Sequence, residues 1–252
     1  MIVKRDMPYP HCGETRRLHI YLPPGYERSC ERYPVMYIFD GHNLYFNEDA
    51  TYGKSWGLKD FLDTWGKGMI VVGMECSHTG NQRLWEYLPY PGETERFGEL
   101  KSWGEETLRW IVEDIKPLID RDYRTIPFRE CTGIAGSSMG GLMALRAALG
   151  WNRWFSKAAC VSSAIGFCPT AVMKDVMETR IDPDTRVYLS WGEKERHVRD
   201  GVDMSRLWND AIADRLHEQG AAAVSYCQSQ GGHCEADWEK LVPGFMDFLW
   251  MR

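Results

Sequence analysis

A serine flanked by glycines stands near the middle of the chain, in Gly136-Ser-Ser138-Met-Gly140. A short apolar run precedes it, and a run with apolar residues at helical spacing follows it, so the serine should lie on a sharp turn between a buried strand and a helix. Such a turn lifts the hydroxyl clear of the sheet and aims the free N–H groups of the helix at a developing negative charge. The spacing therefore predicts that Ser138 is a nucleophile.

A serine hydroxyl is a weak nucleophile and needs a base, usually a histidine that a carboxylate holds in place. His233 follows an expected strand at 224–227, and two glycines before it let the loop turn toward the serine. Two carboxylates, Glu193 and Glu195, follow an expected strand at 186–191. A carboxylate needs a longer loop to reach His233 across the strand ends, and Glu195 lies four residues beyond Trp191 whereas Glu193 lies two. Glu195 is therefore favoured as the acid, while Glu193, or a Ser–His pair without an acid, stays open.

The negative charge of a tetrahedral intermediate needs hydrogen-bond donors, each contributing about 3 kcal/mol. We expect the backbone N–H of Met139 to supply one, and the turn of Gly41 and His42, after an expected strand at 34–39, to supply the other. Asp40 and His42 suggest metal ligands at first sight. No further His/Asp cluster stands at ligand spacing, so no metal site is predicted.

Expected strands alternate with helical patterns along the chain, which favours an α/β fold with a mostly parallel sheet and helices on both faces. No repeat or linker divides residues 1–252, so a single domain is expected. Pro117 should kink the last turn of the helix expected at 110–119, and Gly220 should end the helix expected at 202–219. The expected strands are 15–23, 34–39, 69–74, 132–135, 157–162, 186–191 and 224–227, and the helices are 110–119, 142–149, 202–219 and 238–250.

Two long stretches, 41–67 and 76–106, show no clear element, and loops of such length are usually functional. Aromatic rings in them would stack on sugar rings or phenolic groups. We therefore predict an aromatic cleft for short or aromatic acyl esters of a carbohydrate or similar polar alcohol, with Arg83 and Glu86 either binding polar parts of the ligand or pairing with each other. The predicted substrate-binding residues are Trp56, Trp85, Tyr87 and Arg83, with Trp103 nearby.

Composition excludes several other classes of partner. The formal net charge is −6 and no basic block occurs, so nucleic acid is not expected. The apolar runs are too short for a membrane span, and the first residues turn polar too early for a signal peptide. The eight cysteines include no Cys-x-x-Cys pair, so we expect free thiols in a reducing cytoplasm. Whether the chain forms a homo-oligomer stays open.

Seven segments of the chain together resemble the putative esterase family of α/β-hydrolases, the esterase D-like group, which includes feruloyl, acetyl-xylan and siderophore esterases. The resemblance implies an α/β-hydrolase fold without a cofactor, with Ser138 as nucleophile, Glu195 as acid and His233 as base. The family's acid is often Asp, and here it is Glu. The matching segments are Tyr21-Leu-Pro-Pro-Gly-Tyr26, Tyr33 to Asn43, Arg83 to Pro89, Ile115 to Arg124, Gly136 to Gly141, Gly192 to Glu195, and Gly232-His233 with Trp238.

The leading interpretation is thus a serine carboxylesterase that acts on a small ester through a Ser-His-Glu triad and an acyl-enzyme. An acyltransferase would use the same triad but pass the acyl group to an alcohol. A siderophore or thioester hydrolase is a further alternative. A non-catalytic binding module is least favoured, because Ser138 and His233 are both present.

Overall fold

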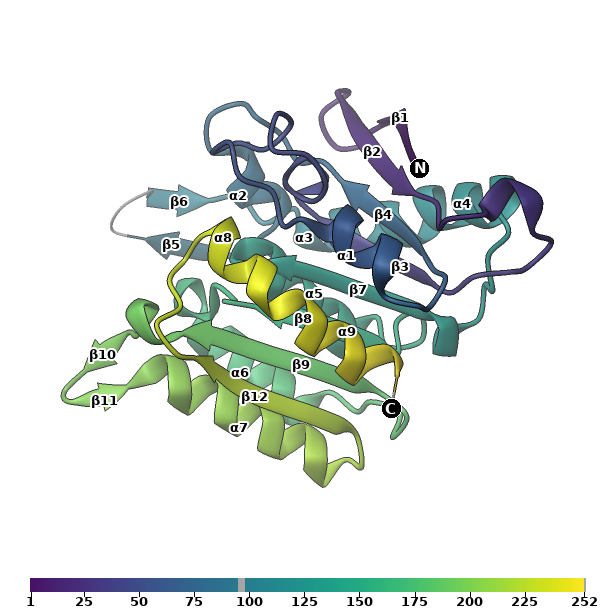
Figure 1. Cartoon of the computed structure of the whole chain (residues 1–252). Helices are drawn as coiled ribbons and strands as arrows, with labels where there is room; N and C mark the ends of the chain where they lie inside the picture. Colours follow the sequence, from purple (N-terminus) through teal and green to yellow (C-terminus); the bar gives the residue numbers. More distant parts are fainter. Residues whose placement is uncertain (95–97, 252) are drawn as a thin grey trace.

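The computed structural model describes residues 1–94 and 98–251, and its centre is an eight-stranded sheet (Figure 1). The strand order is β1-β2-β4-β3-β7-β8-β9-β12. The strands from β4 to β12 are parallel, while β1 and β2 run antiparallel at one edge. The eight strands are β1 Ile2–Pro8, β2 Thr15–Tyr21, β3 Val35–Phe39, β4 Ile70–Met74, β7 Thr132–Ser137, β8 Lys157–Val161, β9 Arg186–Gly192 and β12 Ala222–Gln228.

Helices cover both faces of this sheet (Figure 1). One face carries α1, α8 and α9, and the other carries α3 to α7. Two short strand pairs lie outside the sheet, β5 Gly92–Thr94 with β6 Gly98–Leu100, and β10 Val198–Arg199 with β11 Val202–Asp203. The helices are α1 Leu58–Thr64, α2 Gln82–Glu86, α3 Gly104–Trp110, α4 Lys116–Asp122, α5 Met139–Gly150, α6 Pro169–Glu178, α7 Met204–Glu218, α8 Glu235–Trp238 and α9 Val242–Trp250.

The central strands are apolar because both of their faces are covered. Every residue of β3 and of β4 is buried, as parallel strands between two helical layers require. The apolar core accordingly has two parts, one beneath α3 to α7 and the other beneath α1 and α9. The predicted α/β-hydrolase architecture, with a mostly parallel sheet between helices, is confirmed. In the described part of the chain, no helix combines the length and the apolar character that a membrane span requires.

The structure corrects several predicted elements. The helix expected at 110–119 runs from Gly104 to Asp122, and a π-helical turn at Ile111–Ile115 interrupts it. The turn lies just before Pro117, which has no N–H to donate to the carbonyl of Glu113. The helix expected from Val202 begins at Met204, because the Asp203 carboxylate accepts hydrogen bonds from the Ser205 and Arg206 N–H groups.

The stretches expected to lack elements contain short ones. Residues 41–67 include α1, and residues 76–106 include α2, β5, β6 and the start of α3. These elements are only three to seven residues long, too short to show a clear period in the sequence. Both stretches leave the carboxyl ends of β3 and β4, so they lie at the edge where an open parallel sheet binds its ligands.

Candidate active site

Ser138 lies on a strained turn between β7 and α5. Its backbone has φ 57° and ψ −120°, a conformation that a residue with a side chain rarely adopts. The neighbouring chain holds it there. The Ser138 N–H donates to the Val161 carbonyl at 2.9 Å, and the Ser138 carbonyl accepts from the Ala164 N–H at 3.0 Å. The predicted strand-turn-helix is confirmed, and the strain lies on the serine itself.

The glycines around Ser138 are required by close backbone packing. A Cβ atom on Gly136 would lie 2.6 Å from the backbone carbonyl carbon of Gly140. A Cβ on Gly140 would lie 2.9 Å from the Cβ of Phe39, and one on Gly141 would lie 2.7 Å from the Val161 carbonyl oxygen. All three distances are shorter than non-bonded contacts allow, so the sharp turn exists only because these positions lack side chains.

His233 and Glu195 meet at the carboxyl ends of two neighbouring strands. β9 and β12 pair in parallel, with Gly192 opposite Gln228, so the loops after them leave the sheet side by side. His233 Nδ1 lies 2.5 Å from Glu195 Oε2. An ionised carboxylate only accepts hydrogen bonds, so Nδ1 carries the proton and Nε2 is left as the acceptor.

Glu193, the other candidate acid, faces elsewhere. Its Oε2 accepts a hydrogen bond from the Gln230 N–H at 3.0 Å, in the loop that leads to His233. It lines a separate surface pocket with residues such as Arg196 and Arg206. Of the two glutamates that the sequence left open, the structure therefore pairs Glu195 with His233.

Glu195 is held on both carboxylate oxygens. Its Oε1 accepts a hydrogen bond from Ser162 Oγ at 2.6 Å and another from the Gly192 N–H. Burial by itself would raise the pKa of Glu195. The hydrogen bonds from His233, Ser162 and Gly192 and the charge of His233 outweigh it and hold that pKa below its usual value. Glu195 is therefore a carboxylate at neutral pH.

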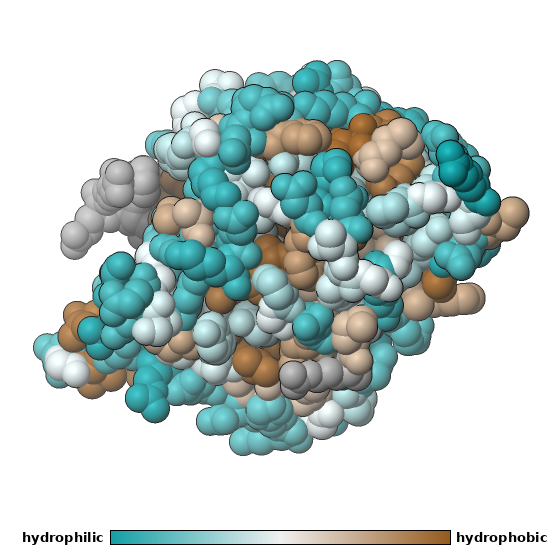
Figure 2. Space-filling view, in the orientation of Figure 1, coloured by the Kyte–Doolittle hydropathy of each residue, from teal (hydrophilic) through white to brown (hydrophobic). Residues whose placement is uncertain are grey.

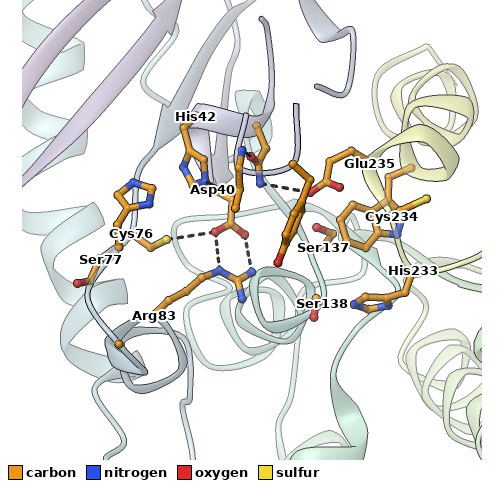
Figure 3. A pocket seen from close by; sticks show the side chains of 16 residues that line it. Asp40, His42, Cys76, Ser77, Arg83, Ser137, Ser138, His233, Cys234 and Glu235 are labelled. Atoms are coloured by element: carbon orange, nitrogen blue, oxygen red, sulfur yellow. Dashed lines mark hydrogen bonds and ion pairs between the residues drawn. The ribbon is translucent and has the colours of Figure 1, made fainter. Parts of the chain in front are cut away.

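Ser138 and His233 line a pocket of about 620 Å³ beside the turn that follows β3 (Figure 3). Figure 3 shows the two side chains next to each other, with Arg83 to their left and with Asp40 and Glu235 above them. Among the described residues, no hydrogen bond joins Ser138 Oγ to the imidazole ring of His233. Catalytic hydrogen bonds often form only in the complex with substrate.

The predicted oxyanion donors lie at the ends of adjacent strands, since β3 and β7 pair in parallel. Met139 is the first residue of α5, so its N–H has no acceptor within the helix. Gly41 and His42 begin a 3₁₀ turn, Gly41–Asn43, directly after β3. Gly41 packs against β4, and a Cβ there would lie only 2.4 Å from the Gly73 carbonyl carbon.

Asp40 and Arg83 fasten this turn. Asp40 has a left-handed backbone (φ 57°), and its carboxylate accepts hydrogen bonds of 2.7 Å from both Nε and Nη2 of Arg83. Burial would raise the pKa of Asp40, but the charge and hydrogen bonds of Arg83 outweigh it and keep that pKa low. Arg83 does line the pocket, whereas Glu86 is buried against Arg16 and the Ser77 N–H. The two residues therefore do not pair with each other.

The His42 side chain faces the pocket beside the turn. Its Nε2 lies 2.9 Å from Thr51 Oγ1, and burial lowers the pKa of the imidazole. Both carboxylate oxygens of Asp40 accept hydrogen bonds from Arg83. Within residues 1–94 and 98–251, no group of three or more His, Cys, Asp or Glu side chains is arranged to hold a metal ion.

The predicted aromatic cleft is wrong for two of its residues. Trp56 and Tyr87 are each only 2% exposed. Trp56 packs between Trp238 and Phe245, and the Tyr87 hydroxyl accepts a hydrogen bond from the Asp40 N–H at 3.3 Å. Both support the site from within the core. Trp85 is partly exposed but does not line this pocket, so its role in binding stays a prediction.

The structure adds residues that the sequence did not single out. Tyr52 lines the pocket and is 82% exposed, and Glu235 lines it with a carboxyl group whose pKa burial raises. Ser162 follows β8 directly, so the rule that parallel strands carry functional residues at their carboxyl ends points to it. The sequence offered no comparable signal for Tyr52.

Comparison with known proteins gives a consistent result. The family model described as "Putative esterase" matches residues 10–248. Ferri-bacillibactin esterase BesA of Bacillus subtilis is 24% identical over 237 residues, which cover 88% of this chain and 81% of that protein. An IroE-like serine hydrolase from Shewanella oneidensis superposes with a TM-score of 0.76 at 19% identity, over 99% of this chain and 79% of that one. A ferulic acid esterase superposes with a TM-score of 0.70 at 18% identity, over 99% and 97% of the two chains.

Proposed function

Since this chain belongs to the putative esterase family, an enzyme family that hydrolyses ester bonds, we propose that it is a cofactor-independent serine carboxylesterase with a Ser138–His233–Glu195 triad. One observation carries the proposal. His233, which contacts Glu195 at 2.5 Å through Nδ1, lines the same pocket as the strained Ser138. The three residues come from loops after β7, β9 and β12, in the chain order Ser, acid, His that this fold uses.

The first half of the reaction acylates the serine. His233 Nε2 takes the proton of Ser138 Oγ while Oγ attacks the ester carbonyl carbon, and Glu195 stabilises the resulting imidazolium. The tetrahedral intermediate places its negative oxygen near the N–H groups of Met139 and of Gly41 or His42. Its collapse breaks the bond to the alcohol oxygen, and His233 returns the proton to the leaving alcohol.

The second half of the reaction releases the carboxylic acid product. Water attacks the acyl carbon of the acyl-enzyme while His233 Nε2 takes a proton from it, and a second tetrahedral intermediate forms at the same donors. Its collapse breaks the bond to Ser138 Oγ, which recovers its proton from His233. The products are a carboxylic acid and a free serine.

The pocket supports a small ester with a polar part as the substrate. Most of the side chains around Ser138 are polar, and Arg83 places among them a guanidinium group that is ion-paired with Asp40. BesA, the relative above, carries the name of a siderophore esterase, so esters of such chelating compounds belong in a substrate screen beside carbohydrate esters. Acyl transfer would use the same residues, and adding acceptor alcohols to the assay would reveal it as a new ester product.

The experiment is hydrolysis of p-nitrophenyl acetate by the purified chain, combined with labelling by a fluorophosphonate. Ser138→Ala should lower kcat by about 10⁴-fold and abolish labelling, because attack then falls to water in the oxyanion hole alone. Ser137→Ala, at the neighbouring pocket serine, should still be labelled. If Ser138→Ala keeps more than about a tenth of the wild-type activity, Ser138 is not the nucleophile.

A further inference from the structure

A third side chain extends the row of hydrogen bonds behind Glu195. Ser162 Oγ donates to Glu195 Oε1 at 2.6 Å, and Trp238 Nε1 donates to the same Ser162 oxygen at 3.0 Å. The row thus runs from Trp238 through Ser162 and Glu195 to His233. It accounts for Trp238, a residue of the family resemblance to which the triad assigns no role.

The direction of every hydrogen bond in this row is determined. An indole N–H can only donate, so Ser162 Oγ must accept from Trp238. An ionised carboxylate can only accept, so the single hydroxyl hydrogen of Ser162 points at Glu195. Trp238 therefore prevents Ser162 from turning its hydroxyl to another acceptor, and one orientation of the Glu195 carboxylate is favoured.

Ser162 is also held in an unusual backbone conformation for this contact. Its φ is 45°, in the left-handed region, and its N–H donates to the Ser190 carbonyl of β9 at 2.8 Å. Ser162 and Trp238 are 5% and 6% exposed, so water competes little for these hydrogen bonds. A strained non-glycine residue is retained where the surrounding structure needs its side chain in one place.

Trp238 touches the other end of the row as well. Its ring packs edge-on against the imidazole of His233, with centroids 5.0 Å apart and planes at 83°. One indole thus contacts the base directly and the acid through Ser162. Such a support suits a glutamate in particular, because its side chain has one more rotatable bond than aspartate and loses more conformational entropy when it is fixed.

We propose that Ser162 and Trp238 are positioning residues, which hold the Glu195 carboxylate against His233 Nδ1 and keep the imidazole in its productive orientation. The inference rests on the proposed triad and extends it by two residues, of which Ser162 lies behind Glu195 and Trp238 also lines the pocket. On this proposal the hydrogen bonds of the row, and not the limited flexibility of a shorter side chain, fix the orientation of the Glu195 carboxylate.

A double-mutant cycle tests the proposal with p-nitrophenyl acetate. Ser162→Ala should lower kcat about tenfold, the worth of one hydrogen bond to a charged group, with KM nearly unchanged. In a Glu195→Gln background the same change should cost less than about twofold, because the group that Ser162 positions has already lost its function. The matched control is Ser163→Ala, since the Ser163 hydroxyl is buried without a hydrogen-bond partner among the described residues.

Two results would overturn the inference. One is a kcat for folded Ser162→Ala within about twofold of wild type, and the other is an equal loss in both backgrounds, which is the additivity expected of independent sites. If Ser162→Ala does not fold, Ser162→Gly replaces it, because glycine adopts the positive φ without strain. If Ser138→Ala keeps its activity, the proposed triad fails; if only the Ser162 effects are absent, the triad stands and this inference alone fails.

Proton NMR gives a readout that a purely structural role would not change. The proton that His233 Nδ1 donates to Glu195 across 2.5 Å should resonate far downfield and be identified by its disappearance in Glu195→Gln. Ser162→Ala removes no ring near His233 and should shift or broaden this resonance, and Ser163→Ala should leave it in place. An unchanged resonance in folded Ser162→Ala would refute the positioning role.

Discussion

Replacing Glu195 by glutamine should disable the enzyme while preserving its shape. In the native chain Oε1 accepts hydrogen bonds from Ser162 and the Gly192 N–H, while Oε2 accepts from His233 Nδ1. A glutamine has one oxygen and one NH₂ group for these two places. If the NH₂ group faced Ser162 and Gly192, it would oppose two donors, and each unsatisfied donor would cost about 1–3 kcal/mol.

The amide oxygen should therefore stay with Ser162 and Gly192, and the NH₂ group should face His233. Nδ1 must then accept a hydrogen bond, so the ring proton moves to Nε2, which can no longer take the proton of Ser138. A change to this wrong tautomer lowers kcat by about 10³- to 10⁴-fold. The assay is steady-state hydrolysis of p-nitrophenyl acetate, with urea unfolding to check that the variant is folded.

Glu193→Gln is the matched control, with the same chemical change two residues away. Its carboxylate faces Gln230 and not the imidazole, so kcat should stay within about twofold of wild type. A Glu195→Gln variant that keeps more than about a tenth of wild-type kcat would refute the reasoning and leave a Ser138–His233 pair without an acid. A loss in Glu193→Gln alone would assign the acid to Glu193.

Three further predictions test the surroundings of the triad. Gly41→Ala should lower kcat about 10²- to 10³-fold with little change in KM, because its Cβ meets Gly73 and displaces an oxyanion donor; a normal kcat would remove this turn from the mechanism. Arg83 holds the folded-state pKa of Asp40 below the unfolded value of 3.8. The Asp40 carboxylate therefore stabilises the fold fully above pH 3.8, and this stabilisation is lost as the pH falls through the lower folded-state pKa. Asp40→Asn should flatten the acid-side fall in the free energy of unfolding, measured with urea. Trp56→Ala should lower the free energy of unfolding, measured with urea, by about 3–5 kcal/mol. A folded variant whose KM rises only for bulky esters would instead support the predicted contact of Trp56 with the substrate.

Local patterns in the sequence were enough for the fold and the core of the candidate site. Apolar runs such as Pro34 to Phe39 and the alternation of strands with helices predicted a mostly parallel sheet. The Gly136-x-Ser138-x-Gly140 spacing predicted the turn. These features could be read directly because each depends on neighbours in the chain. Strand and helix periods, and the missing side chains that let Gly136 approach Gly140, are properties of contiguous residues.

Contacts between distant segments could not be read in this way. Glu193 and Glu195 both follow β9, and the choice between them depends on the loop after β12, where Gln230 binds one and His233 the other. Trp56 looked equally suited to a cleft or a core, and the packing of Trp238 from α8 and Phe245 from α9 against it decides for the core. Ser162 reaches Glu195 across 33 residues because β8 and β9 are neighbours in the sheet. Residue type limits what a side chain can do, but the partner it meets depends on which strand ends lie side by side, and that is a property of the folded sheet.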